Sequence, residues 1–190
     1  MPLKTPVSRR LVSLGLGALP AACSSPNPAL YVLAPRPGII RHGAPKSIIV
    51  RRIAMARYLE RSQIVRSTDG YRIDVLPNDW WGEPLDAMIL RILVEELGER
   101  LPGSSVFSDN GAIAPPSDVA VEVNLQRMDL DSRGTLDLAA QIAADARTVR
   151  SRGVALSVRP EDSSTKALVA AMSVAVGQLA DAIAALLTGQ

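Results

Sequence analysis

Cysteine and histidine carry much of the nucleophilic and metal-binding chemistry of proteins, and this sequence of 190 residues has one of each. His42 lies in a Pro- and Gly-rich run, with no cysteine or carboxylate at the spacing of a metal site. The sequence also has no nucleophile elbow, no P-loop and no dinucleotide-binding fingerprint. We therefore expect no catalytic residue, no metal and no cofactor, and we predict that the protein is not an enzyme.

Two carboxylates, Asp129 and Asp131, are spaced like a general acid/base pair. They end a run of alternating apolar residues and precede Gly134, so the start of a turn explains them better than catalysis does. We expect them to shape the chain rather than to react.

Cys23 has the more informative surroundings. It follows the apolar run 11–22, which is itself preceded by the basic residues Lys4, Arg9 and Arg10. This charge order is typical of a signal peptide, and the run is shorter than the roughly 20 residues that a membrane-spanning helix needs. No later segment is expected to span a membrane, so residues 1–22 are interpreted as a leader.

The residues around Cys23 resemble a lipobox, although Pro20 stands where leucine is usual. The resemblance implies that the leader is removed and that Cys23 becomes an acylated N-terminus, with palmitate among its chains. Ser24 in place of aspartate implies sorting to the outer membrane. Cleavage after Ala22 that leaves a free thiol is the alternative.

These features divide the chain into three parts. Residues 1–22 are the predicted lipoprotein signal peptide, and residues 23–29 are the acylated N-terminus with a short polar linker. Residues 30–190 are the folded domain, which is long enough for one hydrophobic core.

The basic charge belongs mainly to the leader. Without its three Lys and Arg, 18 of the 21 basic residues remain against 19 acidic ones, so nucleic acid is not expected as a partner. One later stretch is still basic, with these arginines: Arg51, Arg52, Arg57, Arg61, Arg66 and Arg72. They fit the solvent face of a sheet, and phospholipid headgroups or an acidic partner are the alternative reading.

Alternating apolar residues predict most of the strands. Short strands are expected at 31–33 and 46–50, followed by a hairpin over 63–75 that turns at Asp69-Gly70. A meander follows at 119–126, 136–142 and 154–158, with a bulge near Arg127 and turns at Gly134 and Gly153.

A period of 3.6 residues predicts two helices. The first begins with Pro84 and ends before Pro102, with Glu96 off its buried face. The second covers about 165–187 and is rich in alanine, and Gly177 would let it lie close to a sheet. The predicted fold class is α+β: a two-layer domain whose mainly antiparallel or mixed sheet carries both long helices on one face.

Trp80 and Trp81 directly precede the first helix and are the only tryptophans. One could pack on the first turn of the helix while its neighbour stays exposed as an interface anchor. Burial of both in the core is an equally good alternative.

Three stretches in this order resemble the PqiC-type ABC-transport auxiliary lipoproteins. They are 58–66, from Tyr58-Leu-Glu-Arg to Ile-Val-Arg66; 81–85, Trp81-Gly-Glu-Pro-Leu85; and 170–183, from Ala170-Ala-Met-Ser to Asp-Ala-Ile183. The resemblance covers the chain from about Tyr31 to its end. Ala56 and Ser62 replace prolines that are usual in the family.

The resemblance implies an outer-membrane lipoprotein that faces the periplasm and serves an MCE-type (mammalian cell entry) intermembrane lipid transport system without being its ATPase. It implies a periplasmic MCE subunit as partner, membrane attachment through acyl chains, and a possible homo-oligomer. The positions that carry the family signature are Tyr58, Leu59, Arg61, Gln63, Trp81, Glu83 and Pro84. A periplasmic lipid-binding carrier is the alternative function.

Overall fold

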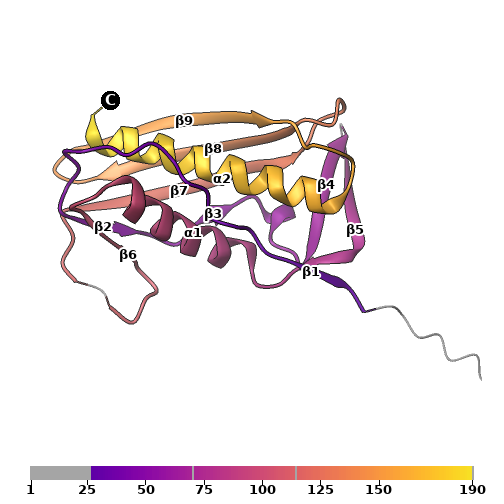
Figure 1. Cartoon of the computed structure of the whole chain (residues 1–190), viewed down its shortest axis with the longest axis horizontal. Coiled ribbons are helices and arrows are strands. Elements are labelled where there is room, and N and C mark those ends of the chain that lie inside the picture. Colours follow the sequence, from indigo (N-terminus) through magenta and orange to yellow (C-terminus); the bar gives the residue numbers. More distant parts are fainter. Residues whose placement is uncertain (1–26, 70, 114, 190) are drawn as a thin grey trace, which may run out of the picture.

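The computed structural model describes residues 27–69, 71–113 and 115–189 (Figure 1). Within these residues the chain forms one mixed sheet of nine strands and two α-helices, which confirms the predicted α+β class. The predicted signal peptide and Cys23 lie outside the described residues.

The centre of the sheet is β7 (Val119–Leu130), a strand whose odd-numbered residues from 119 to 125 are buried. One edge of β7 pairs antiparallel with β8 (Leu136–Asp145), which pairs in turn with β9 (Val149–Val158). The predicted meander is therefore confirmed. The pairing with β8 shifts between Leu125 and Arg127, so the predicted bulge is present.

The other edge of β7 is divided among three parallel strands. They are, in order, β2 (Ser47–Val50), β3 (Ala54–Met55) and β4 (Gln63–Asp69). A short 3₁₀ helix, η1 (Arg57–Leu59), lies between β3 and β4. Because three separate segments share this edge, the sheet is interrupted beside η1.

Three more strands widen the sheet on this side. β5 (Arg72–Trp81) forms the predicted hairpin with β4 and runs six residues beyond the expected end. β1 (Ala29–Tyr31) pairs parallel with β5, and it ends where the strand was expected to begin. β6 (Ser105–Ser108) pairs with β2 and was not predicted, because four residues give too little alternation.

Both helices lie on the same face of the sheet, as predicted (Figure 1). α1 (Leu85–Arg100) begins one residue later than predicted, since Pro84 has extended backbone and only its carbonyl joins the helix, accepting from the Met88 N–H. α2 (Thr165–Thr188) begins with the Ser164 side chain accepting a hydrogen bond from the Ala167 N–H.

No segment after the leader was expected to be able to span a membrane. By length and composition alone, this expectation is wrong. α2 meets both criteria, but 72% of its most apolar window is buried inside the domain. Its buried side chains include Leu168, Met172, Val176 and Ile183, which join the central core. α2 is therefore apolar because it covers β8 and β9.

Two further expectations are wrong. Gly153 is not in a turn but inside β9, opposite Gln141, and the chain turns between Asp145 and Val149. Gly177 does not approach the sheet: a Cβ built there would lie 3.0 Å from the Arg36 Cβ. The small side chain at 177 makes room for the N-terminal segment that crosses α2.

That crossing segment, residues 32–41, is called the strap here. It leaves β1 and passes over the helices before β2 begins (Figure 1). Side chains of both helices accept its backbone N–H groups: Glu96 of α1 binds Arg36 at 2.6 Å, and Asp181 of α2 binds Ile39 at 3.0 Å. The helices thus supply acceptors for backbone N–H groups of the strap, which has no regular secondary structure.

Candidate functional site

The two most specific family-like stretches, 58–66 and 81–85, meet at the start of α1. The Trp81 N–H donates to the Ser62 carbonyl over 2.7 Å, and Gln63 lies opposite Trp80 in the β4–β5 pair. Residues that are about 20 positions apart in the chain therefore form one local structure.

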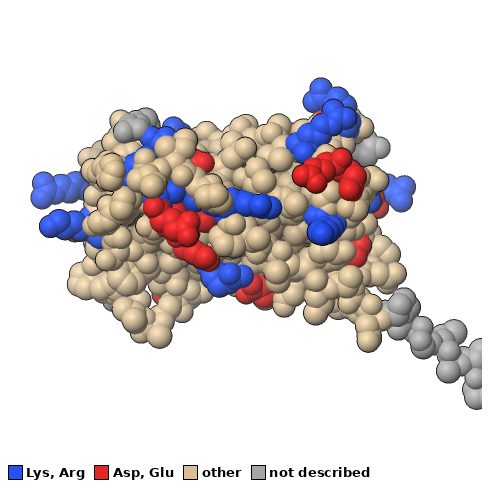
Figure 2. Space-filling model, in the orientation of Figure 1, with Lys and Arg blue, Asp and Glu red and all other residues tan. Residues whose placement is uncertain are grey.

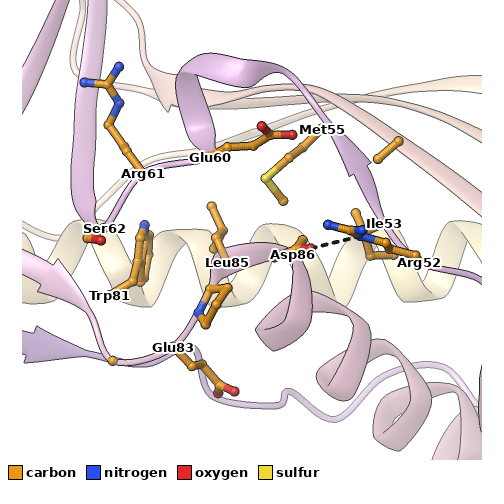
Figure 3. Close-up of a pocket in the computed structure, with 13 residues that line it drawn as sticks. Arg52, Ile53, Met55, Glu60, Arg61, Ser62, Trp81, Glu83, Leu85 and Asp86 are labelled. Carbon is orange, nitrogen blue, oxygen red and sulfur yellow. Dashed lines mark ion pairs between the residues drawn. The ribbon is translucent and has the colours of Figure 1, made fainter. Parts of the chain in front are cut away.

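A groove of about 800 Å³ lies between this structure and the interruption in the sheet (Figure 3). Its walls include the apolar side chains of Ile53, Met55, Trp81 and Leu85. Met55 and Leu85 point into the space from opposite sides. The groove exists because β3 and β4 do not form a continuous strand along β7.

Charged side chains surround the apolar walls. Arg52 and Asp86 form an ion pair of 3.4 Å at one end, and Glu83 accepts a hydrogen bond of 2.6 Å from Arg91. Arg61 lines the other end, where its Nε donates to the Tyr58 carbonyl over 2.9 Å. Apolar walls with a polar rim suit the binding of apolar groups from a partner.

Four of the seven signature positions line the groove: Arg61, Trp81, Glu83 and Pro84. The other three support it from behind. Leu59 is 3% exposed in the core, and Gln63 starts β4. The hydroxyl of Tyr58 donates to the Asp129 carboxylate over 2.6 Å, and burial next to this carboxylate raises the pKa of Tyr58 well above its ordinary value.

Asp129 and Asp131 have separate structural roles. Asp129 is completely buried in β7, which its position near a turn did not predict. Asp131 begins the turn as expected: it accepts from the backbone N–H of Thr135 at 2.8 Å, which lowers the pKa of its carboxyl. Neither carboxylate faces the groove.

The two tryptophans differ in exposure. Trp81 is 7% exposed beside Leu85, whereas Trp80 is half-buried and its Nε1 donates to the Pro77 carbonyl. Complete burial of both is therefore wrong, and Trp81 packs beside the start of the helix while Trp80 is partly exposed. An interface role for Trp80 stays a prediction.

Three of the six arginines in residues 51–72 make an ion pair or a hydrogen bond to another segment of the domain. Arg51 pairs with Glu122 at 2.6 Å, Arg52 pairs with Asp86, and Arg66 donates to the Ser163 carbonyl. Basic and acidic side chains also lie close together on the face shown in Figure 2. The reading as charges on solvent-exposed faces therefore fits the arrangement.

A buried charged cluster beneath the strap was not predicted from the sequence. Glu96 was expected off the buried face but is completely buried, and Arg100 is 1% exposed. The Arg100 guanidinium lies 2.7 Å from Asp181 and also donates to the carbonyls of Arg36 and Gly177. The helical period contained this signal, because 96 and 100 continue the series 85, 89 and 92.

Chemically, the groove combines apolar walls with a charged rim that includes Glu60, Glu83 and Asp86. No set of three or more His, Cys, Asp or Glu side chains in the described part of the chain is placed to hold a metal ion. His42 is exposed in the strap-to-β2 connection, away from the groove.

Residues 31–184 match the family described as the ABC-type transport auxiliary lipoprotein component. A comparison with curated proteins finds no match.

Solved structures share the fold at low sequence identity. An uncharacterized protein has a TM-score of 0.71 and 19% identity over 84% of this chain and 97% of its own. A Xanthomonas campestris protein from a family of unknown function has a TM-score of 0.69 and 18% identity over 85% and 97%. A PelC dodecamer from Paraburkholderia phytofirmans reaches only 0.43, with 13% identity over 83% and 95%, which indicates nothing about assembly here.

Proposed function

This chain belongs to the family of ABC-type transport auxiliary lipoprotein components, and we propose that it is a PqiC-type member anchored in the outer membrane. In this proposal acyl chains on Cys23 hold it there, and its domain faces the periplasm as a non-enzymatic part of an MCE-type intermembrane lipid transport system. The observation that carries the proposal is the convergence of four signature residues on one groove.

The groove is the proposed docking site for the periplasmic MCE subunit. Its apolar walls would take side chains of that subunit, while Arg61 and the Arg52–Asp86 pair would set the orientation from the rim. Because the buried Trp81 forms one wall, the groove has a rigid aromatic surface of the kind that anchors protein interfaces.

Co-purification from membranes tests the docking site. Arg61→Glu reverses a charge on an exposed rim residue, so the domain should fold while recovery of the MCE subunit falls. Arg57→Glu is the matched control, since Arg57 is exposed on the neighbouring η1 and does not line the groove. Recovery of no transporter component with wild-type protein, under conditions that preserve other membrane complexes, would contradict the proposal.

Anchoring is tested separately by membrane fractionation and intact mass. Wild-type protein should be in the outer membrane with the added mass of diacylglyceryl, and Cys23→Ala should lose both. A soluble protein that is cleaved after Ala22 and unmodified would contradict the anchor. Self-association into a homo-oligomer stays a prediction for the same preparations.

The groove also favours a second function, that of a lipid carrier. Its volume of about 800 Å³ and apolar walls are within the range of small-molecule sites. Native mass spectrometry of the protein should then show bound lipid, and Leu85→Asp in a groove wall should remove it. A mass without lipid would exclude this function.

A further inference from the structure

Three apolar side chains lie next to each other where the described chain begins. Leu30 of β1 is 67% exposed, Val32 just after β1 is 58% exposed, and Trp80 of β5 is half-buried. Leu30 and Trp80 are direct neighbours in the parallel pair of β1 and β5, so their side chains share one face of the sheet. Val32 continues this face beside Gly82, since its Cγ1 would lie 3.2 Å from a Cβ at that glycine.

The opposite face of the same two strands is turned inward. Trp81 is buried there, and the Asp79 carboxylate accepts a hydrogen bond of 2.9 Å from Thr165 at the start of α2. The alternation of strands therefore accounts for the inner side chains by packing. It leaves Leu30 and Val32 exposed on the outer face, with Trp80 only partly covered beside them. Single exposed apolar residues are common on protein surfaces, whereas three adjacent ones indicate contact with something outside the domain.

The length of the chain before this patch limits what it can contact. Leu30 follows Cys23 by seven positions, and a fully extended segment of that length spans at most about 25 Å. If Cys23 carries the acyl chains, the patch is held within this distance of the bilayer.

We propose that Leu30, Val32 and Trp80 rest in the headgroup region of the bilayer and orient the domain on the membrane. The inference rests on the proposed function, because it uses the anchor at Cys23. Tryptophan suits this position, since its ring is apolar while its indole N–H prefers a polar setting. Asn78 is exposed two residues before Trp80, and its polar amide keeps the contact at headgroup depth, where the amide stays hydrated.

Tryptophan fluorescence tests this contact directly, because the chain has two tryptophans and Trp81 is buried. The mature protein, purified from membranes, is reconstituted in vesicles of phosphatidylethanolamine and phosphatidylglycerol that contain lipid brominated close to the headgroup. Bromine should quench part of the emission, and Trp80→Phe should remove the quenched part. The Leu30→Ser/Val32→Ser double variant should also lose quenching, because both substitutions remove apolar area beside Trp80.

Ile113→Ser is the matched control. Ile113 is 69% exposed in the β6–β7 connection, at the other end of the domain from β1 (Figure 1). This variant should be quenched as strongly as wild type. Wild-type emission that does not respond to brominated lipid would overturn the proposal, and so would equal quenching of the double variant and the control.

The same preparation separates the patch from the anchor. If intact mass shows no acyl chains, the anchor fails, and sedimentation with the same vesicles then tests the patch alone. If wild-type protein sediments with the vesicles and the double variant does not, the patch binds the membrane without the anchor. Equal sedimentation of wild type and the double variant would overturn the proposed membrane contact. This outcome does not depend on which transporter component is recovered in the docking experiment.

Discussion

The Tyr58 hydroxyl and the Asp129 carboxylate are joined by a hydrogen bond of 2.6 Å that connects η1 to the central strand β7. Asp129 is completely buried and also accepts from the Arg127 Nε at 3.0 Å. This bond holds the first signature stretch against the sheet, so it positions the wall of the groove without lining it.

Tyr58→Phe removes this donor while keeping the ring. We expect a loss of about 1–3 kcal/mol in the free energy of unfolding, because the buried carboxylate loses one of its hydrogen bonds. Urea denaturation measures the change. Tyr71→Phe is the control, since Tyr71 is fully exposed and should change stability by less than about 0.5 kcal/mol. Equal effects of the two substitutions would show that the bond to Asp129 contributes nothing.

Arg100→Met removes the cation from the buried cluster beneath the strap. Glu96 and Asp181 would then face each other without their shared guanidinium, so we expect a loss of about 3–5 kcal/mol by chemical denaturation. Arg91→Met removes a largely exposed ion pair with Glu83 and should cost at most about 1 kcal/mol. A small effect at Arg100 would mean that the strap is not held by this cluster.

Glycine-to-alanine substitutions in the two helices should differ in effect. Gly98 of α1 has open space where a Cβ would lie, so alanine there should stabilise the protein by about 0.5–1 kcal/mol through better helix propensity. At Gly177 of α2 the new Cβ would meet the Arg36 Cβ at 3.0 Å, and the strap would have to move. The midpoint temperature of thermal unfolding should therefore be higher for Gly98→Ala than for wild type, and lower for Gly177→Ala than for Gly98→Ala. The reverse order would contradict the packing of the strap on α2.

The buried Glu96 should make stability depend on pH. Desolvation raises the pKa of this carboxyl in the folded protein, against an ordinary value of about 4.3 in the unfolded chain. The folded state then binds the proton more tightly, so wild-type stability relative to Glu96→Gln should fall as pH rises from the unfolded pKa through the folded one. Urea titrations of both proteins across this range measure the difference. If wild-type stability relative to Glu96→Gln instead rises with pH, then Arg100 and the Arg36 N–H lower the pKa of Glu96 by more than burial raises it.

Local sequence patterns were sufficient to predict most of the helices and strands. Alternation identified β7 and β8 and even the bulge before Arg127, because each inward residue of a half-buried strand must be apolar. The 3.6-residue period identified α1 and α2 to within one or two residues for the same reason. Patterns failed for Gly153 and β6, where a flexible residue or a short segment takes its conformation from its neighbours in the sheet.

The sequence by itself determined the α+β class, the order of the main elements and the two stretches that form the groove. Tertiary structure alone decided that these stretches meet through Trp81 and Ser62, that Glu96 and Arg100 are buried, and that Leu30, Val32 and Trp80 form one surface. The physical reason is the distance along the chain over which each signal acts. Burial periodicity acts between residues a few positions apart, whereas a groove, a charged cluster and a surface patch depend on contacts between segments that only the folded chain brings together.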